Sequence, residues 1–249
     1  MNILVCISSV PDTTSPINFK NNNQNFNNDG ITYIINPYDE FCLTKAVFIK
    51  EEKNANITVI NVGGNTNDSI LRKALAIGAD NAIRINTEAK NSEIVANCIA
   101  KHCSENDFDL IFCGRESIDY NGGKVPGFLA AKLNMPFING CIGLDLNGSI
   151  IEVKREIDNG HEVSTTSLPA VIAGQKGLVE EKDLKIPSMR GIMSARTKPL
   201  NVLESNLSID NEIKVIEYSK PAERSECKIM NEDEVEKLVE LLNKEAKVI

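Results

Sequence analysis

Short apolar runs alternate with segments of helical periodicity over the first 135 residues, and this alternation limits the possible folds most strongly. Strands are expected at 3–7, 31–35, 57–62, 81–85 and 109–113. Helical spacing lies between them, and the expected helices end near Glu52, Ile77 and Cys103. Such an alternation is typical of a parallel sheet with helices on both faces and right-handed crossovers. The sequence therefore predicts the α/β class, with a doubly wound, mostly parallel sheet.

Local signals indicate where two of these helices begin and end. Asn36 can cap the first helix and Pro37 fits its first position, where a missing N–H costs nothing. Thr66 or Asp68 can cap the second helix, and Gly78 is expected to end it. These signals make the two helices the most clearly bounded elements of the sequence.

The pattern changes after Pro136, where Asn-Gly turns separate runs with strand composition. The expected strands are 141–146, 150–157, 161–168 and 168–173. Asn147-Gly148 and Asn159-Gly160 separate the first three, and Asn-Gly between such runs is the strongest short-range hairpin signal. The sequence therefore predicts an antiparallel hairpin addition to the parallel sheet.

The segment 109–137 is the best candidate for a ligand site, because it combines a strand end, a polar loop and a helix start. Gly114 breaks the strand, and Gly122-Gly123 allows the backbone to approach a bound group. Open α/β sheets bind ligands at the carboxyl ends of their strands. The helix dipole and Lys124 suit a phosphate. An ordinary strand–helix turn is the alternative, since neither a G-x-G-x-x-G nor a Walker sequence is present.

Composition and charge exclude several classes of protein. The 249 residues carry a net charge of −8 and a pI near 5.0, which argues against nucleic-acid binding. No apolar run reaches the roughly 18 residues that a membrane span needs. The first residues lack the charged region and cleavage site of a signal peptide, so we expect a cytoplasmic protein. With two histidines and no G-x-S-x-G elbow, the sequence predicts neither a metal site nor catalytic residues.

A locally basic and apolar segment, 185–198, stands out in this acidic chain. Positive charge can steer an acidic partner and methionine gives an adaptable contact, although a loop packed on its own domain is the alternative. The tail has a strand-like run at 213–218 and a final helix at 233–247. The helix is expected to bury one apolar face and to strap a partner, using Val235, Leu238, Leu241 and Leu242.

Five segments together resemble the beta subunit of the electron transfer flavoproteins. They are INPYDE at 35–40, RKALAIGAD at 72–80, GRESIDYNGGKV at 114–125, VKREIDNGHE…LPAVIAG at 153–174 and IPSMRGIMSAR at 186–196. The fourth follows the family signature except at Asn159 and Ser164. In the third, Lys124-Val125-Pro126-Gly127 replaces the common Gln-x-Gly ending. The resemblance covers most of the chain up to about residue 205.

The resemblance implies a fold, a function and a set of partners. The fold is that of the adenine nucleotide alpha hydrolases. The function is that of a non-catalytic subunit that binds AMP and, with an alpha subunit, holds one FAD in a heterodimer. This FAD carries electrons from acyl-CoA and other dehydrogenases to the quinone pool, through electron transfer flavoprotein–quinone oxidoreductase. The implied parts are a nucleotide-binding domain at 1–184, a partner recognition loop at 185–198 and an arm at 199–249 that contacts the alpha subunit.

Family contacts carry over by position to three groups of residues. Those expected to bind AMP from separate segments are Cys6, Asn36, Pro37, Tyr38, Asp39 and Val62. Those expected to wrap the phosphate and ribose are Gly114, Arg115, Glu116, Ser117, Ile118, Asp119, Tyr120, Asn121, Gly122, Gly123, Lys124 and Val125. Those expected to dock into dehydrogenases are Ile186, Met189, Arg190, Ile192, Met193 and Arg196, with Met189 in the anchoring position.

Two alternatives remain open at this point. In electron-bifurcating members of the family a second FAD occupies the AMP site, which two flavins per heterodimer and NADH reactivity would mark. A stand-alone adenine-nucleotide-binding protein of the universal-stress type shares the architecture, and a stable, colourless monomer would favour it. The Ser-Gly-Gly-x-Asp-Ser loop of ATP pyrophosphatases is absent after the first strand, which argues against that enzyme class.

Overall fold

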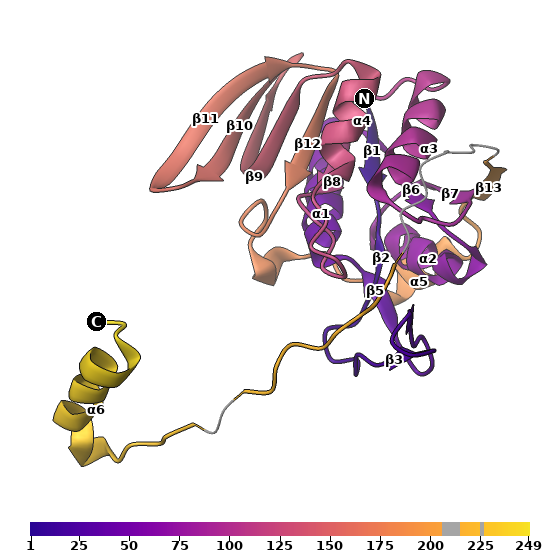
Figure 1. Ribbon diagram of the computed structural model, residues 1–249. Helices are drawn as coiled ribbons and strands as arrows, with labels where there is room; N and C mark the ends of the chain where they lie inside the picture. The colour runs from indigo at the N-terminus through magenta and orange to yellow at the C-terminus, as the bar shows by residue number, and fades with distance from the viewer. Residues whose placement is uncertain (206–214, 225–226) are drawn as a thin grey trace. The chain divides into compact units, whose positions relative to one another are not determined.

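The computed structural model describes residues 1–205, 215–224 and 227–249, and the chain divides into two compact units (Figure 1). The first unit comprises Met1–Asn18 and Asn27–Lys214, and the second comprises Phe19–Phe26 and Val215–Ile249. Among the described residues no helix has both the length and the apolar character needed to cross a bilayer.

A sheet of nine strands, counted over the described residues, forms the centre of the first unit. Its strand order is β11-β10-β9-β12-β8-β1-β6-β7-β13. The parallel strands are β1 (Asn2–Cys6), β6 (Asn56–Val62), β7 (Asn81–Asn86), β8 (Leu110–Gly114), β12 (Ala170–Gly174) and β13 (Leu200–Glu204). Antiparallel pairing joins β9 (Phe137–Asn147), β10 (Ile150–Ile157) and β11 (Gly160–Ser167). The predicted mostly parallel sheet with an antiparallel hairpin addition is therefore confirmed.

Helices cover both faces of this sheet, as the sequence predicts. They are α1 (Pro37–Lys53), α2 (Asp68–Ile77), α3 (Ser92–Ser104), α4 (Val125–Leu133) and α5 (Met189–Ala195), with short 3-10 turns at Asn65–Asn67 (η1) and Glu181–Asp183 (η2). In the central strand, Ile3 and Val5 belong to the core beneath α1 and α2, and Leu4 and Cys6 to the core beneath α3 and α4. Figure 1 shows α1 on the opposite side of the sheet from α3 and α4.

The order in which the chain adds strands to the sheet reverses beside β1, and this determines where a ligand site can form. The chain proceeds from β1 to β6 and β7 on one side, and then returns to β8 on the other side of β1. In open α/β sheets the crevice for ligands lies at such a reversal, outside the carboxyl ends of the strands. The β1–β8 junction is therefore the place to look for a site.

The first two helices end where expected, but their predicted capping side chains have other partners. Pro37 opens α1, and Gly78 ends α2. Asn36 occupies the N-cap position of α1, yet its side chain makes no capping bond. At α2 the N-cap is Asn67, the last residue of η1, and the carboxylate of Asp68 accepts a bond from Arg84. Long-range pairing therefore replaces the local capping that the sequence predicts.

Three further elements differ from expectation. The strand expected at 31–35 is β5 (Tyr33–Ile35), which pairs with β2 (Ser9–Pro11) in a separate antiparallel sheet. The edge strand β13 was not predicted and extends the sheet beside β7. The basic segment 185–198 contains the helix α5 rather than only a loop.

The second unit combines a small hairpin with the C-terminal segment. Strands β3 (Phe19–Lys20) and β4 (Asn25–Phe26) pair across a turn of three asparagines with φ between 53° and 61°, a conformation that asparagine tolerates. The ring of Tyr218 stacks on that of Phe19 at 5.1 Å between centroids, and the Tyr218 N–H donates to the Asn23 carbonyl over 2.7 Å. This unit therefore joins residues about 200 apart in the sequence.

The predicted elements of the tail are only partly found. The expected strand at 213–218 begins in residues 213 and 214, which lie outside the described residues, and residues 215–218 are not in a strand. The final helix comprises a 3-10 turn Glu232–Glu234 (η3), α6 (Val235–Leu241) and a π turn Leu242–Ala246 (η4). Its apolar face is not buried, because Val235 is 60% exposed and Leu238 is 40% exposed. Leu241 and Leu242 on the same face are half-buried.

Candidate functional site

Three of the predicted residues lie at the carboxyl ends of adjacent parallel strands. β1 pairs with β6 on one side and β8 on the other, with Cys6 beside Ile60 and Val5 beside Phe112. Cys6 and Val62 end β1 and β6, and Gly114 ends β8. The register therefore brings these strand ends to one edge of the sheet, at the reversal of strand order.

Asn36 ties the start of α1 to the loop that follows β8. Its side-chain amide donates to the Glu116 carbonyl over 2.8 Å, and the N–H of Ile118 donates to its side-chain oxygen over 3.2 Å. The Asn36 N–H donates to the Ser8 carbonyl over 3.0 Å, and the residue is 1% exposed. Asn36 therefore joins three chain segments that lie more than 25 residues apart in sequence.

Asp39 bridges the ends of the two strands at the reversal. One carboxylate oxygen accepts the N–H of Gly114 over 2.8 Å, and the other accepts the N–H of Ser8 over 2.7 Å. Burial raises the pKa of Asp39 to about 7, and the bonds from Ser8, Asn36 and Gly114 oppose this rise. The carboxyl group is thus an internal ligand for two backbone amides at the carboxyl edge of the sheet.

The loop from Arg115 to Lys124 has a closed internal structure. Ser117 and Gly122 face each other in an antiparallel bridge, and the Ser117 N–H donates to the Gly122 carbonyl over 3.2 Å. Asp119 accepts bonds from the Ser117 hydroxyl at 2.6 Å and from the Tyr120 N–H at 2.9 Å. Asn121 has φ near +49°, and the side chain of Tyr120 is 71% exposed. The loop therefore presents its tip to the outside while its base is fixed.

The spatial need for glycine differs along this loop. A Cβ at Gly114 would lie 2.3 Å from the Asp39 carboxylate, and one at Gly123 would lie 3.0 Å from the Arg115 carbonyl. A Cβ at Gly122 would meet only the Ser117 hydroxyl, at 4.0 Å. Neighbouring atoms therefore leave no room for a side chain at Gly114 and Gly123, whereas at Gly122 there is room for one.

The loop leads directly into the N-terminus of α4. Lys124 holds the N-cap position and is exposed, Val125 opens the helix, and Pro126 follows in its first turn. The free N–H groups and dipole of a helix start favour an anionic ligand. The predicted residues from Gly114 to Val125 thus form one continuous path from the end of β8 to this positive helix end.

A second layer of polar contacts holds Arg115 in place. Its N–H donates to the Gly174 carbonyl over 2.8 Å, and its guanidinium donates to the Gln175 side-chain oxygen over 3.0 Å. The Gln175 amide in turn donates to Glu156, over 2.5 Å. The antiparallel addition is therefore connected to the loop through the end of β12.

Sequence reasoning missed Arg84, a guanidinium that is buried at the end of β7. This residue is 5% exposed, and its Nε donates to Asp68 over 2.6 Å. Its Nη1 donates to the Gly63 carbonyl over 3.2 Å and to Asn86 over 2.8 Å. A charged residue within the apolar run NAIRI is the signal that could have identified it, because a buried charge needs partners.

Ser8 and Asn61 were also missed. The Asn61 amide donates to the Ile7 carbonyl over 2.8 Å, and its oxygen accepts the Asn67 side chain over 2.9 Å. Ser8 contributes through its backbone, so its side-chain type gave no signal. Together these bonds connect the ends of β1 and β6 with the turn before α2.

All six residues that were expected to dock a partner are exposed, within α5 or close to either end of it. Met189 is 78% exposed, and Ile186, Arg190, Ile192, Met193 and Arg196 are also in the exposed class. Ala195 alone within α5 is buried, so the helix rests on the first unit while its larger side chains face outward. This segment also bonds to α2 of its own unit, so the alternative of a segment packed on its own domain stays open beside docking.

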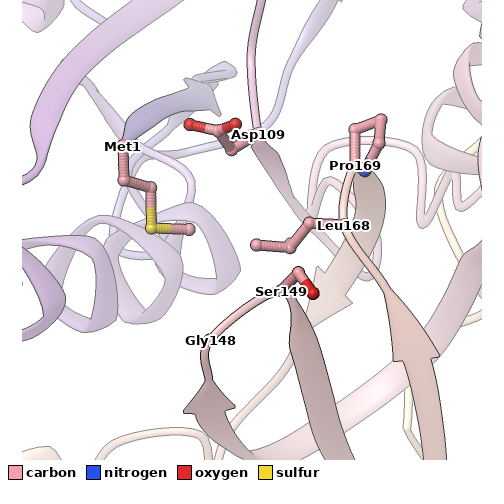
Figure 2. A pocket seen from close by; sticks show the side chains of 6 residues that line it. All are labelled: Met1, Asp109, Gly148, Ser149, Leu168 and Pro169. Atoms are coloured by element: carbon pink, nitrogen blue, oxygen red, sulfur yellow. The ribbon is translucent and has the colours of Figure 1, made fainter.

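A pocket of about 350 Å³ lies elsewhere, at the amino ends of the strands (Figure 2). Met1, Asp109 and Pro169 precede β1, β8 and β12, and they line it together with Gly148, Ser149 and Leu168. The Asn2 N–H donates to Asp109 beside it, over 2.7 Å. This pocket is at the opposite edge of the sheet from the candidate site.

Within the described part of the chain, no cluster of three or more His, Cys, Asp or Glu is arranged to hold a metal.

Several known proteins are similar to this chain over all or most of its length. The profile of the family described as "Electron transfer flavoprotein domain" matches residues 25–208. The electron transfer flavoprotein subunit beta of Bacillus subtilis is 35% identical over 262 aligned residues that cover 100% of both chains. The subunit beta of Syntrophomonas wolfei is 32% identical over 100% of this chain and 98% of its own.

A third relative has a different name. Acryloyl-CoA reductase electron transfer subunit gamma of Anaerotignum propionicum is 30% identical, over 82% of this chain and 78% of its own. The chain belongs to the family of electron transfer flavoprotein beta subunits.

Proposed function

We propose that the chain binds AMP at the carboxyl edge of its sheet and, with an alpha subunit, holds one FAD that carries electrons. The observation that carries the AMP assignment is the convergence of the ends of β1, β6 and β8 with Asn36 and the 114–125 loop. An adenylate placed there would meet backbone amides of the loop and the positive N-terminus of α4. This combination of a hydrogen-bonding loop and a helix dipole is what a nucleotide phosphate requires.

The proposed path of electrons runs from acyl-CoA and other dehydrogenases to electron transfer flavoprotein–quinone oxidoreductase, in the cytoplasm. The chain itself supplies binding surfaces and no catalytic residues, while FAD supplies the redox chemistry when it is bound. The relative from Anaerotignum propionicum is an electron transfer subunit of an acryloyl-CoA reductase, which supports a partner that acts on acyl-CoA. Family membership argues against the stand-alone, universal-stress-type alternative.

The alpha subunit is proposed to contact the arm at 199–249. The uncovered apolar residues of α6 support this assignment, because a soluble chain seldom leaves a contiguous apolar helix face without a partner. Val235, Leu238 and Val239 are exposed on this helix. The stacked pair of Phe19 and Tyr218 would then hold the arm at Tyr218 within the second unit.

The nucleotide content of the purified heterodimer tests the first part of the proposal. We expect one AMP and one FAD per heterodimer after denaturation and chromatography of the released nucleotides. Asn36→Ala should release AMP but keep FAD, because it removes both side-chain bonds that fix the 116–118 turn. Asn201→Ala, at an exposed position of β13, serves as the control and should keep both.

Two outcomes would change this assignment. If no adenine nucleotide beyond FAD is released, the AMP site is wrong. Two FAD molecules without AMP, together with reduction by NADH, would instead establish the bifurcating alternative with a second flavin at the same site.

Docking through α5 is tested by Met189→Ala. Burial of the methionine side chain in a partner is worth about 1.5–3 kcal/mol, so we expect the KM for the carrier to rise about tenfold or more. The assay varies the heterodimer concentration against an acyl-CoA dehydrogenase and follows flavin reduction. Ser194→Ala, a small change on the same exposed helix, should leave the KM unchanged. Equal KM values for the two variants would remove α5 from the docking surface.

A further inference from the structure

We propose that Arg72 on α2 is a positioning residue that holds α5 in its docking conformation. Its guanidinium Nη1 donates to two backbone carbonyls at the end of α5, those of Ala195 and Lys198, each over 2.7 Å. Neither bond is made to the exposed docking side chains. The inference rests on the proposed docking function. It assigns to Arg72 an indirect role, in which the residue orders α5 without itself contacting the partner.

Lys198 makes the reciprocal contact from the other side. Its Nζ donates to the carbonyls of Leu75 over 3.0 Å and Ala79 over 2.6 Å, at the C-terminal end of α2. A cation at this end of a helix satisfies carbonyls that lack partners within the helix. Segment 195–198 and α2 therefore exchange four charge-assisted bonds, which we call the α2–α5 clamp.

The middle of α5 is also held closely against α2. A Cβ at Gly191 would lie 2.3 Å from the Ala76 carbonyl, so the two helices approach there at backbone distance. At the start of α5, the Ser188 hydroxyl accepts the Gly191 N–H over 3.0 Å. Contact with α2 thus reaches α5 near its centre and at its end, while Met189, Ile192 and Met193 remain exposed.

Helix α5 needs such support because it has only seven residues. Isolated helices shorter than about 12 residues are marginally stable in water, because a few hydrogen bonds do not offset the free energy of nucleation. Without the clamp, the docking side chains would sample many arrangements. A surface that is already ordered binds more tightly because less conformational entropy is lost on association. The clamp should therefore control affinity for the partner and leave the electron transfer step unchanged.

The experiment compares Arg72→Gln with Lys73→Gln in the intact heterodimer. Lys73 is the next residue on α2, but its Nζ pairs with Glu40 over 2.6 Å and not with α5. For Arg72→Gln, which removes both charge-assisted bonds, we expect the KM for the carrier to rise about tenfold or more, with kcat unchanged. Arg72→Lys should recover most of the affinity, because one nitrogen makes both bonds. Lys73→Gln should leave the KM unchanged.

Hydrogen exchange separates failure of the clamp from failure of the docking proposal. In Arg72→Gln the amides of residues 189–198 should exchange about tenfold faster, while those of β1 and β8 stay protected. Unchanged exchange and unchanged KM would overturn the clamp even if Met189→Ala impairs docking. Faster exchange with an unchanged KM would also overturn it as a docking device. Loss of FAD or of kcat would show a general structural role instead.

A second variant keeps the test decisive if Arg72→Gln does not assemble. Lys198→Gln removes the reciprocal pair of bonds and leaves Arg72 in place. Like Arg72→Gln, it should raise the KM for the carrier and leave kcat unchanged. An unchanged KM in this variant would contradict the proposal in the same way.

Discussion

Gly114→Ala is expected to lower the free energy of unfolding by about 3 kcal/mol and to empty the proposed AMP site. The added Cβ would lie 2.3 Å from the Asp39 carboxylate, 2.8 Å from the Tyr38 Cβ and 3.0 Å from the Asn36 amide. None of these groups can easily move. Asp39 is held by two backbone amides and Asn36 by two bonds to the loop. The methyl group would therefore displace the end of β8 or break buried hydrogen bonds.

Gly122→Ala is the matched control for this prediction. It adds the same methyl group to the same loop, but the nearest atom is the Ser117 hydroxyl at 4.0 Å. We expect a change in stability within about 0.5 kcal/mol. Urea unfolding of the purified chains and AMP content of the heterodimers are the two measurements. If Gly114→Ala matches Gly122→Ala in both, the close approach at Gly114 does not constrain the site.

The sheet could be predicted because its strands carry strong and repeated signals. β1, β6 and β8 are short, mostly apolar runs of the kind that a parallel sheet covered on both faces buries. The two Asn-Gly turns likewise determined the hairpins of β9, β10 and β11. In contrast, β13 could not be predicted, because four of its five residues are exposed at the edge of the sheet and give no buried pattern.

The position of the site could be predicted from topology, but its internal contacts could not. The rule that ligands bind at carboxyl strand ends indicated Gly114 and the loop that follows it, and the family resemblance added Cys6 and Val62. A local helix rule assigned Asn36 to the start of α1 as a cap, and Asp39 lies in the first turn of that helix. Their side chains instead bond to groups 31 to 82 residues away. Such pairings arise from the tertiary structure and leave no local trace.

The same limitation applies to the docking segment. Its positive charge and its methionines were visible in the sequence, and the structure shows that both methionines are exposed. The helix α5 was not predicted, because seven residues that include Gly191 have little helical signal of their own. Arg72 and Lys198 stabilise it from outside, through backbone carbonyls that sequence analysis cannot pair.

Asp39 is expected to make the stability of the chain fall as the pH rises from about 4 to 7. Burial raises its pKa from the ordinary value of 3.8 to about 7 in the folded state. Within this window the unfolded chain has already released the proton that the folded chain keeps, so rising pH favours unfolding. Below the window both states are protonated and above it both are ionised, so the effect levels off. Between pH 5 and pH 8 the loss is about 2–3 kcal/mol.

Asp39→Asn isolates this effect, because the amide does not titrate and keeps one acceptor for the Ser8 or Gly114 N–H. The contributions of other titrating groups to the pH dependence should cancel when the two chains are compared. The neighbouring thiols of Cys6 and Cys42 remain protonated, because their pKa values are raised well above 9. Urea unfolding at several pH values, after removal of bound nucleotide, should show the advantage of the native chain shrinking by about 2–3 kcal/mol from pH 5 to pH 8. An advantage that stays constant or grows would mean that the two amide bonds stabilise the ionised carboxylate more than burial penalises it. Asp39 would then be an anion held by backbone amides, and an adenylate phosphate would have to bind beside a permanent negative charge.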